Sequence, residues 1–286
     1  MESIVANSTL SSHSRSISLP SSSHPFILSL EQNLGRLRSS ENASTSSTCQ
    51  KLDGLKNLYE SLDDVLQLPL SLKVFSHERN GKWEEEILDG SLRLLDICGT
   101  VKDIYFQMKE TVQELQSSLR RKRFGELDSE VDTYMISKKR LNKMIFRCCK
   151  ELKKAEKNCT LELTDKEVDL VKVIKQVQEV TLTTLESAVS FISGPKAGSQ
   201  PRGWSLVSRM LQSKTTSCKE QSDNAGIQKI EAELLLLKNK KPNQENDLLK
   251  QLGASDENIQ ELVEILEVVF RLLLKIRVSL LNILNH

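Results

Sequence analysis

The chain has 286 residues, of which 4% are aromatic, and it contains only 11 glycines and 6 prolines. So few aromatic and turn-forming residues exclude a β-sandwich or a β-barrel, and the composition predicts an all-α protein. The 40 basic and 39 acidic side chains nearly cancel, which excludes a global attraction to nucleic acid or to an acidic membrane. Any electrostatic role must therefore be local.

The first 48 residues are rich in serine, and Glu2 is the only acidic residue before Glu31. This composition fits a plastid transit peptide, and it also fits a disordered tail with too few apolar side chains to offset the entropy lost on ordering. We favour the tail over residues 1–48, with a short helix near residues 25–38. Residues 49–286 are expected to form one helical domain.

Two amphipathic helices are predicted in the first half of that domain. Leucines recur every three or four residues across residues 51–68, and Pro69 ends the pattern. A connector leads to a longer helix over residues 83–121. Its two glycines, Gly90 and Gly99, each cost up to about 1 kcal/mol relative to alanine. They either admit a close neighbouring helix or mark a break near Gly99.

The third predicted helix, over residues 129–157, has two separate faces. Apolar residues that include Leu141, Ile145 and Leu152 fall in one sector at about 100° per residue. Basic residues fall in the opposite sector, and we call them the basic face: Lys139, Lys143, Arg147, Lys150, Lys154 and Lys157. Residues 120–157 hold 13 basic and 6 acidic side chains, a local net charge of +7.

A fourth helix is predicted to begin at a capping box formed by Thr164 and Glu167 and to end near Ser193, before a Gly-Pro pair. Irregular connectors are expected near residues 194–203 and 215–226. Shorter helices are expected around residues 204–214, 234–237 and 248–252, the last of them closed by Gly253.

The last helix is predicted to begin at Ser255 and to run nearly to the carboxyl terminus. Its apolar residues step by three and four, which is the spacing of a heptad seam. A membrane-spanning interpretation competes, but five charged residues within the segment favour a helix buried in a bundle. The candidate packing seam consists of Ile259, Leu262, Leu266, Val269, Leu273, Ile276, Leu280 and Ile283.

No motif indicates an enzyme. The chain has no Gly-rich phosphate loop and no metalloprotease or serine hydrolase signature, and its 4 histidines and 6 cysteines lack metal-ligand spacing. The adjacent Asp63 and Asp64 point about 100° apart on a helix, so we interpret them as surface charges. Cys148 lies on an apolar stripe and is interpreted as a core residue. We therefore predict no catalytic residue, no cofactor and no metal.

The basic face admits four interpretations. It could contact an anionic membrane or an acidic partner, it could contact nucleic acid, or residues 120–123 could form a nuclear localisation signal. Alternatively, it could be a solvated helix face whose charge is balanced by acidic helices nearby, with residues such as Glu261, Glu264 and Glu267. Nucleic acid is disfavoured, and the expected lack of aromatic residues among the basic ones counts against single-stranded nucleic acid in particular.

Five sequence blocks carry a family resemblance. They are RSISLPSSSHP from Arg15, LYESLDDVLQLP from Leu58, LDGSLRLLDICGTVKD from Leu88, LQSSLRRKR from Leu115 and RVSLLNILNH from Arg277. Their order and spacing resemble a plant-specific family of helical proteins of unknown function that is grouped distantly with the BYPASS proteins. The resemblance implies a helical plant protein with a link to root and shoot development, and it supplies no site residue. It also makes a cleaved transit peptide less favoured.

We therefore predict an elongated all-α bundle that acts as a non-catalytic interaction or regulatory protein in root and shoot development. Its mechanism is expected to be helix-mediated binding of a protein partner, and the seam could also join two copies. The alternative is a peripheral membrane adaptor that uses the basic face. The expected location is intracellular, in the cytoplasm first, with the nucleus and the membrane periphery as alternatives and the plastid disfavoured.

Overall fold

The computed structural model describes residues 24–42, 46–77, 82–121, 127–159, 169–193 and 245–285 of the chain. Every regular element in these ranges is a helix, so the predicted all-α fold is confirmed. The helices are α1 (Pro25–Asn42), α2 (Thr48–Leu66), α3 (Pro69–His77), α4 (Lys82–Arg121), α5 (Leu127–Cys159), α6 (Asp169–Ser193) and α9 (Glu245–Asn285).

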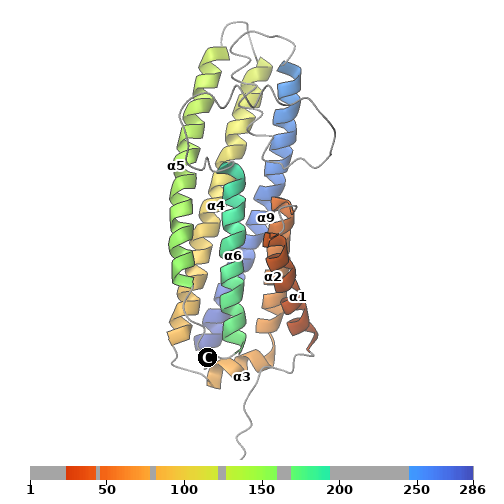
Figure 1. Cartoon of the computed structure of the whole chain (residues 1–286), viewed down its shortest axis with the longest axis vertical. Coiled ribbons are helices and arrows are strands. Elements are labelled where there is room, and N and C mark those ends of the chain that lie inside the picture. The colour runs from red at the N-terminus through yellow and green to blue at the C-terminus, as the bar shows by residue number, and fades with distance from the viewer. Residues whose placement is uncertain are drawn as a thin grey trace, which may run out of the picture.

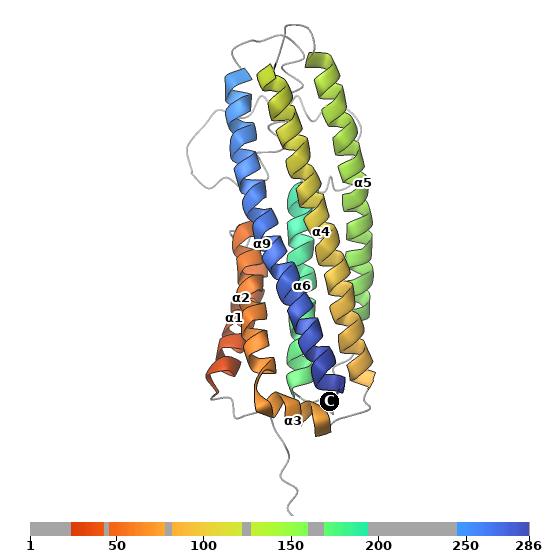
Figure 2. The same ribbon diagram turned by 180° about the vertical axis from the view of Figure 1, so that it is seen from behind.

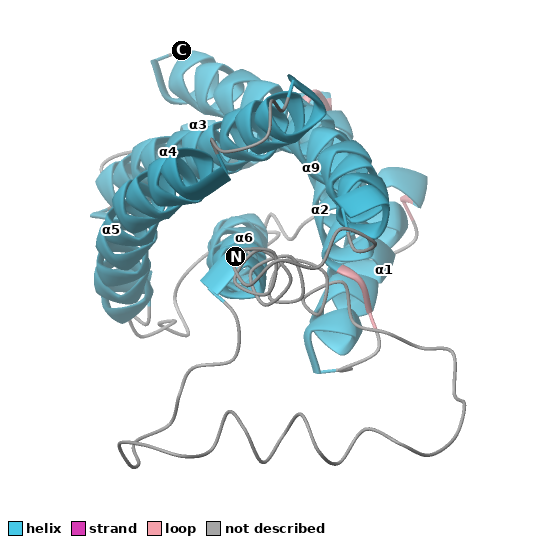
Figure 3. Ribbon diagram, turned by 90° about the horizontal axis from the view of Figure 1, so that it is seen from above, coloured by secondary structure: helices cyan, strands magenta, loops and turns pink. Residues whose placement is uncertain are grey.

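The helices form an elongated bundle, as predicted. The three longest, α4, α5 and α9, run along the long axis of the body, and α1, α2 and α6 occupy part of its length (Figure 1). The view from behind shows α9 and α4 side by side in front of α6 (Figure 2). Viewed along the axis, α5, α4, α9, α2 and α1 follow a curve, and α6 lies inside it (Figure 3). This arrangement places α5 at one end of the curve.

Helix α6 joins the two halves of the bundle because it contacts α4, α5, α2 and α1. Two buried tyrosines fix it: the hydroxyls of Tyr59 and Thr181 are 2.8 Å apart, and the Tyr105 hydroxyl donates to the carbonyl oxygen of Ala188 at 2.8 Å. Burial raises the pKa of both phenols well above their usual range. The tyrosines therefore act as uncharged packing groups whose polar ends are hydrogen-bonded.

Gly90 allows α4 and α6 to approach closely. A Cβ at this position would lie 2.5 Å from Oε1 of Gln178, a buried α6 residue whose Nε2 donates to the Ile87 carbonyl at 3.0 Å. Helix α4 continues without a break through Gly99. Of the two interpretations of these glycines, close approach is therefore the one that the fold supports.

The packed body begins before residue 49, which corrects the predicted boundary between tail and domain. Helix α1 is longer than the helix expected near residues 25–38, and it packs against α2 and α6. Its core side is built from Ile27, Leu30, Leu34 and Leu37, all buried. These four residues at helical spacing suffice to dock α1, although serine and other polar residues dominate the surrounding sequence.

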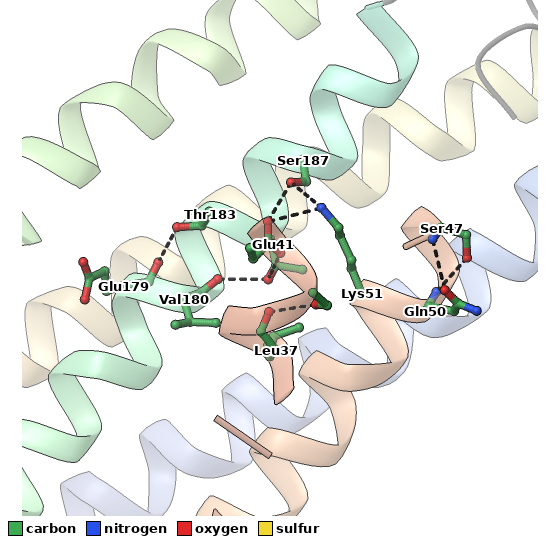
Figure 4. A network of polar contacts seen from close by, with 11 residues as sticks. Leu37, Glu41, Ser47, Gln50, Lys51, Glu179, Val180, Thr183 and Ser187 are labelled. Atoms are coloured by element: carbon green, nitrogen blue, oxygen red, sulfur yellow. Dashed lines mark hydrogen bonds and ion pairs between the residues drawn. The ribbon is translucent and has the colours of Figure 1, made fainter. Parts of the chain in front are cut away.

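A polar network fastens the carboxyl-terminal end of α1 to α2 and α6 (Figure 4). The Glu41 carboxylate accepts hydrogen bonds from Thr184 at 3.0 Å and from Ser187 at 2.9 Å, and Lys51 Nζ lies 3.4 Å from it. Beside it, Ser47 and Gln50 form a capping box that starts α2. Helices α1 and α2 are therefore held together by directional contacts as well as by apolar packing.

The start of the last helix was predicted wrongly. Helix α9 is continuous from Glu245, so Gly253 does not end a separate helix and Ser255 does not cap a new one. Leu248 and Leu252 are buried and extend the apolar side of the helix toward Ile259. Burial of that side outweighs the local stop signal of the glycine.

Helix α3 was not predicted. Pro69 occupies its first position, where a missing N–H costs little, and the Ser71 hydroxyl donates to the Val65 carbonyl at 2.6 Å. Phe75 packs against Trp83 of α4, with ring centroids 5.4 Å apart. The predicted ends of the preceding helix near Leu68 and of α6 at Ser193 agree with the fold.

Several predictions lie outside the described residues. They are the serine-rich segment before residue 24, the capping box at Thr164, the helices at 204–214 and 234–237, and the connectors at 194–203 and 215–226.

Candidate functional site

Helix α5 presents one side to the bundle and the other to solvent. Its core side packs against α4 and α6 through Tyr134, Leu141, Ile145, Cys148, Leu152 and Ala155, all buried. Its main neighbours in the described part of the chain are α4 and α6, in keeping with its place at the end of the curve (Figure 3). The separation of apolar and basic residues in the sequence is therefore reproduced as an inner and an outer side.

All six residues of the basic face, Lys139 to Lys157, are exposed. Their spacing places them in one sector that extends about 27 Å along the helix. Arg140 and Lys153 are exposed at its edges, while burial lowers the pKa of the Lys138 ammonium on the flank. The basic face is thus a continuous cationic strip.

Acidic residues close to this strip are few. Between residues 138 and 157 the only acids are Glu151 and Glu156, and their helical positions lie away from the centre of the strip. Among described residues, Lys139, Lys143, Arg147, Lys150 and Lys154 form no ion pair. The cationic charge of the strip is therefore directed at solvent.

Exposed apolar side chains lie beside the cationic strip, which the sequence interpretation missed. Phe146 is 73% exposed, Ile136 is 56% exposed and Met135 is 40% exposed. Phe146 lies between Lys143 and Arg147, so an aromatic residue does interleave the basic ones. The signal was available, since Phe146 falls outside the apolar stripe of Leu141 and Ile145 by its position around the helix.

Glu267 of α9 is used inside the bundle and does not balance the basic face, but the exposure of all six basic residues agrees with the solvated-face interpretation. Helix α9 packs on α4, α2 and α3, and its Glu267 faces α4, where Lys102 Nζ lies 2.9 Å from the carboxylate. The hydrogen bond from Lys102 holds the pKa of Glu267 below its usual range. Arg271 adds a second contact to the same carboxylate at 3.0 Å.

The same interface between α4 and α9 holds further polar contacts. Lys109 donates to the side chain of Gln260, and Arg277 donates to the Leu88 carbonyl and to the Ser91 hydroxyl. Lys102 also lies over the ring of Phe270, 4.5 Å from its centroid. The polar side of α9 is therefore largely used inside the molecule.

The candidate packing seam on α9 is buried within the chain. Its eight residues are each at most 9% exposed, and they face α4 and α2: Ile259, Leu262, Leu266, Val269, Leu273, Ile276, Leu280 and Ile283. A second copy of the chain cannot reach this seam unless the bundle opens. The seam is a structural element of the monomer.

The family of the chain follows from one comparison. The family model described as Protein BPS1 matches residues 51–283. The chain belongs to the BPS1 family. No curated protein and no solved structure matches it.

The BPS1 match begins within α2 and ends within α9, and it includes both the basic face and the packing seam. Helix α1 lies before the matched residues. Membership of the BPS1 family agrees with the resemblance found in the sequence and implies a regulatory role in plant development. It assigns no functional residue.

The remaining candidate groups of this BPS1-family chain are structural. Burial raises the pKa of the Cys98 and Cys148 thiols to about 12, which makes both poor nucleophiles. Asp63 is buried and pairs with Lys275 at 2.7 Å, whereas Asp64 is exposed. The interpretation of both aspartates as surface charges is thus wrong for Asp63.

Within the described ranges, no three His, Cys, Asp or Glu side chains gather as metal ligands would. In the same ranges, no helix is both long enough and apolar enough to cross a bilayer.

Proposed function

We propose that the protein is a non-catalytic regulatory protein of plant development that acts by binding an anionic partner through the basic face of α5. The observation that carries this proposal is the contrast between the cations of α5, which meet solvent, and those of α4, which meet acids and amides of α9. An exposed row of like charges attracts an anionic partner, because the potentials of its members add.

The rigidity of α5 supports the same proposal. The helix is anchored along its length by buried residues from Tyr134 to Ala155, so its outer side chains project from a fixed backbone. A preorganised row of cations loses less conformational entropy on binding than a flexible basic segment does. The basic face is therefore suited to an extended anionic surface.

The test is proximity labelling in root tissue with three versions of the full chain. They are the wild type, a Lys143→Glu/Arg147→Glu variant, and a control with Lys82→Glu/Lys250→Glu, which reverses two exposed cations on α4 and α9. We expect the α5 variant to lose a set of neighbours that the control keeps. Identical neighbour sets in all three versions, with equal expression and circular dichroism, would overturn the proposal.

A further inference from the structure

We infer that the anionic partner is a membrane surface, and that the outer side of α5 lies on the lipid headgroups with Phe146 inserted among them. This inference rests on the proposed function and names the class of partner.

The apolar residues of the outer side carry the first step. Phe146 is the most exposed large apolar residue in the described part of the chain, at 73%. Met135 lies eleven residues before it, which puts the two within about 20° of each other around the helix axis. Ile136 projects from the same outer half of the helix and is 56% exposed. Removing this apolar row, which is spread over about 17 Å of the helix axis, from water would gain free energy.

The cations around these residues carry the second step. Lys143 and Lys150 lie within about 60° of Phe146 around the axis, one turn to either side. Long basic side chains can extend their charged ends to headgroup phosphates while an aromatic ring between them enters the acyl boundary. The outer side of α5 thus combines the two features that bind a peripheral helix to an anionic bilayer.

Other anionic partners match the cations of this surface but not its exposed apolar side chains. An acidic peptide or a duplex nucleic acid backbone neutralises the cations but offers no apolar phase to Ile136 and Met135. A single-stranded nucleic acid can stack a base on Phe146, yet such binders use several aromatic residues in succession, and α5 exposes one. A lipid surface matches the charge and the apolar row together.

The experiment is flotation of the full chain with vesicles of phosphatidylcholine and phosphatidylserine, compared with vesicles of phosphatidylcholine alone. We expect binding to the first and not to the second, and we expect it to weaken as salt is raised. Lys143→Glu/Arg147→Glu should lower the partition coefficient at least about 30-fold, since each basic residue near an anionic surface contributes about fivefold. The control Lys82→Glu/Lys250→Glu should bind like the wild type.

The contribution of Phe146 is measured separately, because charge alone also attracts acidic partners. Phe146→Ser should weaken vesicle binding about tenfold, while Phe106→Ser, which removes a 52% exposed phenylalanine from α4, should leave it unchanged. Phe146→Trp and Phe106→Trp form a second matched pair. We expect vesicles with brominated acyl chains to quench the emission added at position 146 and not that added at position 106.

Failure of this inference differs from failure of the proposed function. If anionic vesicles do not bind the wild type, or if Phe146→Ser binds them as well as the wild type does, the membrane assignment is overturned. If the α5 charge variant still loses neighbours in root tissue, the basic face retains a partner of another class. Binding of an RNA oligomer in place of vesicles would also overturn the membrane assignment.

Discussion

Helices α5 and α9 look alike in sequence, since both are long and both separate apolar from polar residues, but they use their polar sides differently. On α9, Glu267, Gln260 and Arg277 bind partners on α4. On α5, the basic face meets solvent. Amphipathic spacing therefore identifies the side of a helix that builds the core, whereas the use of its other side depends on which helices become neighbours.

The position of each helix explains this difference. Helix α9 lies between α4 and α2 in the curve, so two neighbours are available to its flanks (Figure 3). Helix α5 lies at the end of the curve, where it packs mainly on α4 and α6 and its basic face is exposed (Figure 3). The end position leaves one helix side open for a partner.

The largest expected effect on the free energy of unfolding tests whether the buried sides of α5 and α9 pack equally well. Leu266→Ala on α9 and Leu152→Ala on α5 each remove a buried side chain, and we expect each to lower the free energy of unfolding by about 2–5 kcal/mol. Leu274→Ala on α9, at a position 48% exposed, should cost less than about 1 kcal/mol. Urea denaturation of the three variants measures these values, and a Leu266→Ala cost equal to that of Leu274→Ala would show that the seam is not packed within the chain.

A smaller effect tests the contrast between the two polar sides. Lys102→Ala removes an ion pair and a cation–π contact from the α4–α9 interface, and we expect a loss of about 1 kcal/mol. Lys143→Ala on the basic face should change the free energy of unfolding by less than about 0.5 kcal/mol. Urea denaturation at low salt measures both, and equal losses would contradict the contrast.

Gly253→Ala tests whether α9 is one continuous helix, and we expect it to raise the free energy of unfolding, whereas the variants above lower it. A Cβ at this position meets only Gln116 Nε2, at 3.5 Å. Alanine should therefore stabilise the protein by about 0.5–1 kcal/mol, through its higher helix propensity. A glycine that ended a helix in a left-handed conformation would instead be destabilised by alanine, so a rise in the thermal midpoint supports one continuous helix and a fall argues against it.

The smallest expected effect is a pH dependence at Glu267. Because its pKa is lowered in the folded protein, its stabilising contribution is complete above its ordinary pKa of 4.5 and is lost as the pH falls through the lowered value. Glu267→Gln should reduce the loss of stability in acid slightly. Thermal unfolding followed between neutral pH and acid compares this variant with the wild type, and identical profiles for the two would contradict the assigned contact.

The sequence predicts the long helices well because their buried residues repeat without interruption. Leu141, Ile145 and Leu152 define the core side of α5 before any neighbour is known. Where local signals and burial disagree, prediction fails: Gly253 suggests a stop, but the burial of Leu252 carries α9 through it. Helix α1 was only partly predicted because four buried residues stand in a serine-rich segment.

The sequence predicts which residues form the basic face, but it does not predict which other side chains lie close to that face. Helical spacing alone places Lys143 and Arg147 on one sector, and both are exposed there. Whether Glu267 neutralises them depends on which helix packs beside α9, and nothing in the spacing of either helix carries that information. The exposure of Phe146 could have been predicted from its place between two basic residues.

The most direct test of the account pairs two charge reversals and measures both stability and vesicle binding for each. Lys143→Glu/Arg147→Glu alters the basic face, and Lys102→Glu/Lys109→Glu alters the α4 cations that meet α9. We predict that the first variant unfolds like the wild type in urea but does not float with anionic vesicles. The second should lose stability and still float while folded. The account would be contradicted if the α5 variant lost stability and still floated, while the α4 variant kept its stability and did not float.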